Sequence, residues 1–285
     1  MKNRQAFGGS FLLCRQGRGS DFIGSWPIYD IFNDKTAKAL AIIYIKEVRI
    51  MNLEMVMQEL EALGKERTKK IYQSNGAHEP LFGVATGEMK PIFRKIKRNQ
   101  PLAEQLYATG NYDAMYFAGM IADPAAMSEA DFERWIDKAY FYMLSDYVVA
   151  VTLAETEIAQ QVSDKWIASD IELKMSAGWS CYCWLLGNRP DSEFSEKKIA
   201  DLLELVKHTI HDAPDRTKYA MNNFIYTVAV SYLPLHEKAV AIAKEVGPVE
   251  VHTGSAKSKF LNASVTIQKA VDKGQLGFKR KYVRC

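Results

Sequence analysis

An aspartate inside an apolar stretch is the first residue whose chemistry needs an explanation. Asp146 lies within residues 141–151 (FYMLSDYVVAV), where almost every other side chain is apolar or aromatic. A carboxylate in such surroundings is unfavourable to bury unless it has a partner. Two interpretations are open: Ser145 or Asp146 begins a helix as its N-cap, or Asp146 is a carboxylate held in a concave site. The chemistry of the residues alone favours the N-cap.

A run of basic residues suggests contacts with phosphate groups. A helix that has Pro91 in its first turn and continues to Asn99 presents four cations on one face. These cations are Lys90, Arg94, Lys97 and Arg98. No acidic residue lies between Lys90 and Asn99, so salt bridges within the helix cannot neutralise them. The stripe is either a phosphate-contacting surface or an ordinary solvated face.

Residues 277–285 (GFKRKYVRC) form a second basic cluster in which aromatic residues are interleaved. Its cations are Lys279, Arg280, Lys281 and Arg284, and its aromatic residues are Phe278 and Tyr282. Such a segment could track a phosphate backbone, and the alternative is a solvated tail. Two basic clusters near opposite ends of a C-shaped molecule would suit the gripping of one polyanion.

Aromatic side chains are frequent around Asp146 and in the residues that follow it. Most of them must belong to the core, and some could line a groove and stack on a ligand. The set comprises Tyr140, Phe141, Tyr142, Tyr147, Trp179, Tyr182, Trp184 and Tyr226.

The elements that must position these residues are helices that repeat along the chain. Residues 134–151 begin RWI and residues 165–186 begin KWI, and each motif precedes a long apolar helix, with Trp135 and Trp166 in equivalent places. A period of this length is typical of stacked helical pairs, each of which needs its neighbours to cover its apolar face. Capping boxes are expected at residues 128–131 and 169–172. We predict an all-α fold, a curved α-solenoid of antiparallel helix pairs with hardly any strand.

Composition and charge exclude several classes of protein. The 285 residues are 48% hydrophobic and 25% charged, as in a soluble globular chain. The net charge is only +3, so affinity for nucleic acid must come from local patches. The four cysteines and five histidines form no metal-binding motif, and the apolar residues 39–45 are too few to cross a membrane. We therefore expect a reduced, cytoplasmic protein without metal or cofactor.

The first fifty residues differ from the remainder of the chain. They carry paired glycines and scattered arginines without sustained periodicity, whereas Met51 and Asn52 precede a clear amphipathic helix. We predict that residues 1–50 are a poorly ordered extension, with Met51 as an alternative initiator. Residues 51–285 then form the helical domain. A short accessory helix at residues 37–48 is the alternative.

Several short segments together resemble a known family. They are GAHEPLFGV at 76–84, ATGNY at 108–112, IADP at 121–124, KWIAS at 165–169 and GFKRK at 277–281. Their types and order resemble the DNA alkylation repair enzyme family, the AlkD-type alkylpurine DNA glycosylases, from about residue 51 to residue 285. The resemblance implies HEAT-like repeats and a DNA-binding concave face.

The resemblance also implies roles for individual residues. Active members of the family carry a Trp, an Asp four positions later, an Arg on the following repeat and a second Trp. The matching positions in this sequence are Tyr142, Asp146, Ser176 and, for the second Trp, Tyr226 or its neighbour Thr227. Asp146 would stabilise positive charge on the deoxyribose while Tyr142 and Tyr226 pack around the sugar. Nothing is expected to replace the arginine that is missing at Ser176.

Two DNA-directed functions follow, and a third interpretation is a protein-binding scaffold. The first function is a monofunctional glycosylase that hydrolyses the N-glycosidic bond of cationic alkylpurines such as 3-methyladenine and 7-methylguanine. The second is a non-catalytic module that binds bent or branched DNA through its shape and phosphates. Asp146 argues for the first and the missing arginine for the second. The expected partner is double-stranded DNA, alkylated or branched, bound by a monomer that associates with the nucleoid.

Overall fold

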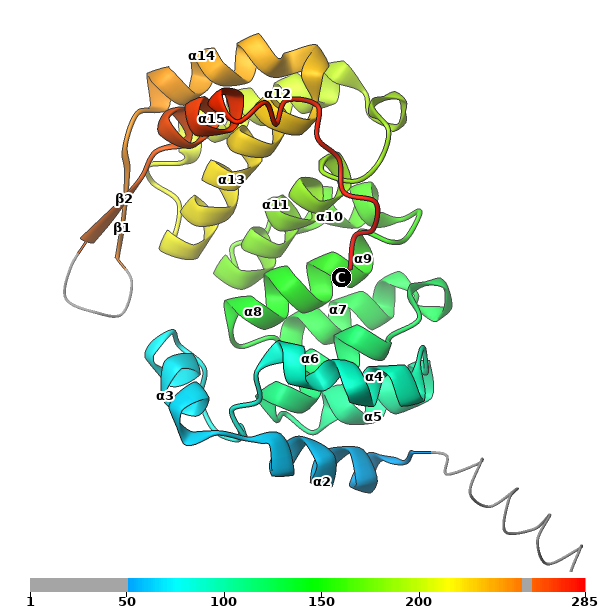
Figure 1. The fold of residues 1–285 in the computed structure, drawn as a ribbon. Helices are drawn as coiled ribbons and strands as arrows, with labels where there is room; N and C mark the ends of the chain where they lie inside the picture. Colours follow the sequence, from blue (N-terminus) through cyan, green and yellow to red (C-terminus); the bar gives the residue numbers. More distant parts are fainter. Residues whose placement is uncertain (1–50, 253–257, 285) are drawn as a thin grey trace, which may run out of the picture. The chain divides into compact units, whose positions relative to one another are not determined.

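Antiparallel helix pairs build almost all of the described chain (Figure 1). The structure is a computed structural model that describes residues 51–252 and 258–284. The expectations for residues 1–50 therefore lie outside the described residues. The described residues all belong to one compact unit, and the predicted all-α solenoid is confirmed.

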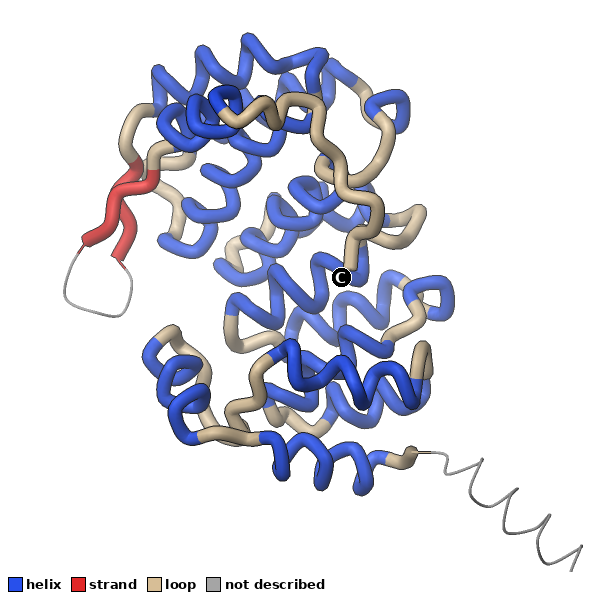
Figure 2. Tube along the Cα trace, in the orientation of Figure 1, coloured by secondary structure: helices blue, strands red, loops and turns tan. Residues whose placement is uncertain are grey.

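The elements follow one another with short connections (Figure 2). The longer helices are α2 Leu53–Leu63, α3 Glu66–Ser74, α4 Lys90–Ile96, α5 Gln100–Ala108, α6 Tyr112–Ile121, α7 Glu129–Lys138, α10 Ala159–Ile167, α11 Glu172–Leu186, α12 Glu196–Thr209, α13 Asp215–Ser231, α14 His236–Val246 and α15 Ala263–Asp272. Between α7 and α10, one continuous helical run consists of α8 Tyr142–Leu144, a π-helical turn Ser145–Val149 and α9 Ala150–Leu153. Short 3₁₀ turns lie at Thr86–Met89, Pro124–Ala126, Asp191–Glu193 and Leu233–Leu235.

One helix of each pair stacks against its counterpart in the next pair. The order of this stack is α6, the run at 142–153, α11 and then α13, while α5, α7, α10 and α14 pack on its other side. The stacked helices are buried over most of their length, since both faces are covered. The stack therefore carries the core of the domain.

The tryptophan repeat predicted from the sequence is confirmed in three dimensions. Trp135 and Trp166 are fully buried. The indole N–H of Trp135 donates to Glu104, 31 residues earlier, at 3.1 Å. That of Trp166 donates to Glu133, 33 residues earlier, at 2.7 Å. Each tryptophan thus joins its own pair to the preceding pair through the same type of contact.

Glycine permits the closest approach between two helices of one pair. A Cβ atom on Gly178 of α11 would lie only 2.9 Å from the backbone N of Ile167 and the backbone O of Ser163, both in α10. Backbone atoms cannot rotate away as a side chain can. The short separation of α10 and α11 therefore requires glycine at this position.

Helix α4 is shorter than predicted. Pro91 lies in its first turn as expected, but the helix ends at Ile96, and Lys97 has a left-handed φ of 60°. Asn99 does not continue α4, because its side chain caps the next helix by accepting from the N–H of Leu102 at 3.1 Å. The four expected cations therefore do not share one helix face.

One of the two predicted capping boxes is present. Ser128 and Asp131 bond reciprocally at the start of α7. The prediction at residues 169–172 is wrong, because α11 begins with no side-chain cap. The Ser169 hydroxyl accepts from the N–H of Ile171 at 3.1 Å. Glu172 instead accepts from the N–H of Arg216 at 2.7 Å.

A small hairpin interrupts the helices, which the sequence pattern did not lead us to expect. Strands β1 Val249–His252 and β2 Ser258–Leu261 pair antiparallel, with Val249 opposite Leu261. Val249 and Val251 are buried and alternate with exposed residues. A four-residue strand carries only two such inward positions, too few for a periodic signal in the sequence. In the part of the chain that the structure describes, no helix has the length and apolar character needed to cross a membrane.

Candidate functional site

Asp146 lies inside a helix, in the π-helical turn Ser145–Val149. The helical run begins at Tyr142, so neither Ser145 nor Asp146 is an N-cap, and that interpretation is wrong. A π-helical turn inserts an extra residue into a helix and is frequent at functional sites. The turn packs directly against α11. The alternative interpretation, a carboxylate held in a concave site, stays a prediction, and Asp146 does line a cavity.

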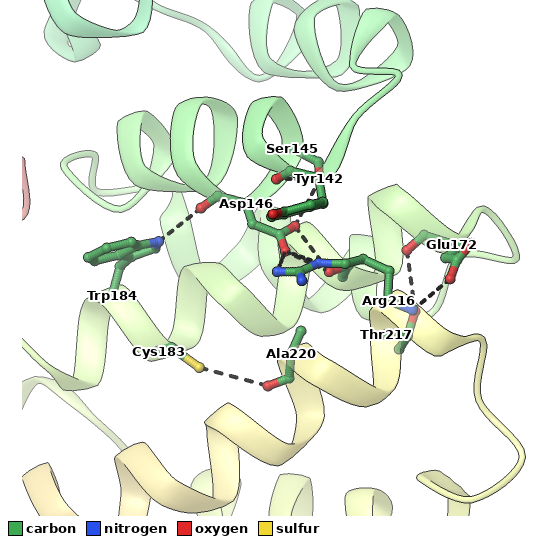
Figure 3. Close-up of polar contacts among 10 residues, drawn as sticks. Tyr142, Ser145, Asp146, Glu172, Cys183, Trp184, Arg216, Thr217 and Ala220 are labelled. Atoms are coloured by element: carbon green, nitrogen blue, oxygen red, sulfur yellow. Dashed lines mark hydrogen bonds and ion pairs between the residues drawn. The ribbon is translucent and has the colours of Figure 1, made fainter. Parts of the chain in front are cut away.

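The Asp146 carboxylate is fully engaged within the protein. Its side chain is only 1% exposed. The hydroxyl of Ser145 donates to Oδ1 at 2.8 Å, and the hydroxyl of Ser176 lies 3.0 Å from both oxygens. Arg216 donates to Oδ2 from Nε at 2.8 Å and from Nη2 at 2.6 Å (Figure 3). A buried ion pair is stable when its remaining hydrogen-bonding positions are satisfied in this way.

The expectation that nothing replaces the missing arginine is wrong, because Arg216 supplies a guanidinium group to Asp146. Ser176 does occupy the position where the resemblance expects arginine, and its hydroxyl bonds to Asp146. The guanidinium group comes instead from the first turn of α13, 70 residues from Asp146. Sequence reasoning missed Arg216 because no local periodicity spans that distance. The only available signal was a cation at the start of an otherwise apolar helix.

Tyr142 contacts the ion pair. The guanidinium carbon of Arg216 lies 4.1 Å from the Tyr142 ring centroid and 5.3 Å from that of Tyr219. Both distances are within the range of cation–π attraction. Burial raises the pKa of the Tyr142 hydroxyl above its usual value. Tyr142 therefore packs on Arg216 (Figure 3).

Tyr226 lies in a cavity beside the ion pair. This cavity has a volume of about 380 Å³, and we call it the Asp146 cavity. Its lining includes Asp146, Arg216, Tyr226, Trp184 and Phe278. Tyr226 and Asp146 thus line the same cavity, and the role expected for Tyr226 stays a prediction.

Trp184 contacts the Asp146 turn, although the sequence analysis named it only as one of a general set of aromatic residues. Its indole N–H donates to the backbone carbonyl of Asp146 at 3.0 Å (Figure 3). The Tyr147 ring meets it edge-on with centroids 6.0 Å apart. The Arg280 guanidinium lies 4.8 Å from the Trp184 ring centroid. Trp184 therefore connects the Asp146 turn to the C-terminal basic cluster.

A larger cavity adjoins the first, and its charged lining residues are basic except for Glu155. It has a volume of about 940 Å³ and shares Tyr147, Trp184 and Arg280 with the Asp146 cavity. We call it the basic groove. Its lining also includes Lys90 and Lys281. Lys90, Arg280 and Lys281 form no ion pair with any described residue, so these cations are available to a ligand.

The predicted cations divide into available and engaged groups. Among residues 51–252 and 258–284, Arg94 and Lys97 have no ion-pair partner. Arg98 is different, because it pairs with Glu155 at 2.9 Å and Asp123 at 3.5 Å. The sequence predicted no acidic partner for Arg98, since its partners lie later in the chain, in the connections after α6 and α9. The expectation of a phosphate contact from Arg98 is therefore weakened.

Lys279 is also engaged. Its ammonium group donates to the carbonyls of Leu186 and Arg189 at 3.1 and 2.6 Å, and pairs with Asp191 at 2.6 Å. The alternative of a solvated tail is wrong for this segment, because Arg284 likewise bonds to Glu155 at 2.6 Å. Cations near the carbonyl end of a helix stabilise it. Lys279 thus has a structural role at the end of α11.

No group of three or more potential metal ligands occurs among the described residues. The arrangement around Asp146 therefore consists of hydrogen bonds, one ion pair and aromatic contacts. Chemically, it can hold a negative charge in a buried position and present aromatic rings and cations beside it.

Comparison with known proteins shows what this chain is similar to. A family model described as DNA alkylation repair enzyme matches residues 56–257. The chain is 31% identical over 227 residues to the uncharacterized protein Lin0241 of Listeria innocua, and 30% identical over 226 residues to Lmo0209 of Listeria monocytogenes. Each match covers 78% of this chain and 98% of the relative.

One solved structure is considerably more similar. It is 76% identical with a TM-score of 0.80, and the match covers 82% of this chain and 100% of that chain. It is described as a new family of proteins related to the HEAT-like repeat DNA glycosylases with affinity for branched DNA structures. The resemblance and the HEAT-like fold expected from the sequence are thereby confirmed.

Proposed function

The chain belongs to the DNA alkylation repair enzyme family, and we propose that it binds branched or bent DNA at the basic groove without excising bases. The observation that carries this proposal is that the Asp146 carboxylate is buried and bonded on all sides within the protein. Its carboxylate is 1% exposed and its charge is paired with Arg216. We also propose that the protein acts as a monomer in the cytoplasm and associates with the nucleoid when it binds DNA.

The geometry of Asp146 disfavours base excision. Loss of a cationic alkylpurine develops positive charge on the deoxyribose, which a nearby carboxylate stabilises only if its own charge is free to act. Here the guanidinium of Arg216 neutralises that charge at 2.6 Å, and two serine hydroxyls occupy the other acceptor positions. A substrate sugar would have to displace Arg216 from both Asp146 and the Tyr142 ring.

The basic groove favours DNA as the ligand. Lys90, Arg280 and Lys281 line it without an acidic partner among the described residues, and Arg94 and Lys97 lie on the same segment as Lys90. The carboxylate of Glu155 in this groove is already paired with Arg98 and Arg284. The groove therefore has a net positive field that suits phosphates. The affinity described for the 76% identical relative favours branched DNA as the ligand.

A second candidate function is slow excision of cationic alkylpurines. The observation that favours it is the position of Asp146 beside a cavity lined by Tyr226 and Trp184. This function would require Arg216 to move away from the carboxylate when DNA binds.

One pair of assays distinguishes the two functions. Fluorescence anisotropy on linear duplex, three-way and four-way junctions of matched sequence measures affinity, and release of 7-methylguanine and 3-methyladenine from methylated duplex measures excision. We expect tighter binding to the junctions than to the duplex and no base release above background. Base release that disappears in Asp146→Asn while DNA affinity is kept would contradict our proposal and support the glycosylase.

A further inference from the structure

The C-terminal segment 277–284 is anchored along its length to helices that are distant in sequence. The backbone N–H groups of Gly277 and Arg280 donate to the carbonyls of Val230 and Gly187, both at 2.8 Å. Beyond these contacts, Arg284 bonds to Glu155 and to the carbonyl of Gly119. The segment accordingly runs from α15 past α11 towards α9 (Figure 1). Its backbone is held in place by bonds at both ends and in the middle.

Two aromatic rings project from this anchored backbone into solvent. Phe278 is 61% exposed and Tyr282 is 66% exposed, whereas Val283 beside Tyr282 is buried. Exposed aromatic rings on a fixed backbone bind ligands with little further loss of conformational freedom. Phe278 lines the Asp146 cavity and Tyr282 lines the basic groove. The two cavities share Trp184, so the two rings belong to one continuous surface.

The surroundings of the two rings identify the chemistry of the ligand. Arg280 lies over the Trp184 ring, and both residues line both cavities. Lys281 lies 5.3 Å from the Tyr282 ring centroid. Neither cation has an ion-pair partner in the described chain. Aromatic rings that alternate with free cations match single-stranded nucleic acid, whose bases stack on the rings while its phosphates contact the cations.

Paired bases do not fit this surface, because both faces of each base pair are covered by its neighbours in a duplex. Unpaired bases at a branch point expose their faces. We infer that Phe278 and Tyr282, together with the Arg280–Trp184 pair, stack on unpaired bases at the branch of the DNA. This inference rests on the proposed DNA binding and narrows its substrate class to branches that contain single-stranded nucleotides, such as flaps or gapped forks.

The test compares a fork carrying a single-stranded flap with a fully base-paired four-way junction. The flap contains 2-aminopurine next to the branch point, whose fluorescence falls when it stacks. The variant is Phe278→Leu/Tyr282→Leu, which keeps apolar side chains but removes the rings. Both positions are exposed, so the fold should be unaffected, and circular dichroism of the variant checks this expectation. The matched control is Lys281→Gln, which removes a charge from the same segment and leaves both rings.

We expect wild-type protein to quench the 2-aminopurine and to bind the flap at least tenfold more tightly than the four-way junction. Each lost ring should weaken flap binding about tenfold, so the double variant should lose both the preference and the quenching. Its affinity for the four-way junction and its salt dependence should remain. Lys281→Gln should weaken binding to both DNAs alike.

The outcomes separate this inference from the function on which it rests. If the double variant binds and quenches the flap as wild type does, the stacking site is refuted while DNA binding stands. If wild type prefers the fully paired junction, the stacking site is equally refuted. If wild type binds neither DNA, the proposed function is refuted as well.

Discussion

Arg216 donates two hydrogen bonds, of 2.8 and 2.6 Å, to one carboxylate oxygen of Asp146, although the two residues are 70 positions apart. The bond joins α13 to the π-helical turn of the run at 142–153, across α11. These two elements are not adjacent in the stack. The contact therefore links three successive stacked helices, namely the run at 142–153, α11 and α13. It also pairs the charge of the carboxylate for which the family resemblance predicted a catalytic role.

We expect Arg216→Gln to destabilise the protein by about 3 kcal/mol, because it leaves the buried Asp146 charge without its partner. Asp146→Asn should destabilise less, because Arg216 is 17% exposed and can turn towards water. Urea denaturation measures both changes and that of the double variant. The double variant should be more stable than the sum of the single losses predicts, by at least 1 kcal/mol. Additive losses would show that the pair does not couple the helices.

We expect the triple change of Lys90, Arg94 and Lys97 to Gln to weaken binding to all DNA sequences alike. The slope of log affinity against log salt should fall by roughly 0.9 for each phosphate contact that is lost. Salt titrations by fluorescence anisotropy measure this slope. The control changes Lys70, Lys165 and Lys197, which are exposed but ion-paired. An equal effect of both triple changes would mean that only net charge matters.

We expect Arg284→Gln to destabilise the protein by about 2 kcal/mol, because Glu155 loses a charged partner and two backbone carbonyls lose a donor. Hydrogen exchange of residues 279–284 should become faster, since this bond holds one end of the segment. Lys281→Gln serves as the control, because Lys281 has no ion-pair partner among the described residues. Unchanged exchange in Arg284→Gln would show that the contacts of residues 277–280 hold the segment without Arg284.

The thiol of Cys183 should react slowly with iodoacetamide in the native protein. Cys183 is only partly buried and lines the Asp146 cavity, and its surroundings raise the pKa of its thiol to about 12, so at pH 8 it should carry far less of the reactive thiolate than an ordinary thiol. The rate should rise tenfold per pH unit up to about pH 11, whereas an ordinary thiol levels off near pH 9. Peptide mapping by mass spectrometry resolves Cys183 from the other cysteines. A plateau near pH 9 would show that the surroundings of Cys183 do not raise the pKa of its thiol.

The basic clusters show how far reasoning from sequence extends to the site. Lys90 and Lys281 were predicted as ligand-facing cations, and the structure leaves both without an ion-pair partner and places them in one groove. Arg98 and Lys279 were predicted in the same way, yet each is bonded within the protein. The residues that engage them belong to other repeats, and sequence spacing carries no information about contacts between repeats.

The sequence by itself determined the helices, the repeat and the family. Helix periodicity, the Ser128 capping box and the matched positions of Trp135 and Trp166 depend on interactions within one helix or on a regular period, so they can be read from the sequence. Only the tertiary structure decided what Asp146 does, because the stacking of three helices brings Ser176 and Arg216 to its carboxylate from 30 and 70 residues away. Packing between repeats, which no local pattern records, turned a residue expected at a reactive site into one half of a buried ion pair.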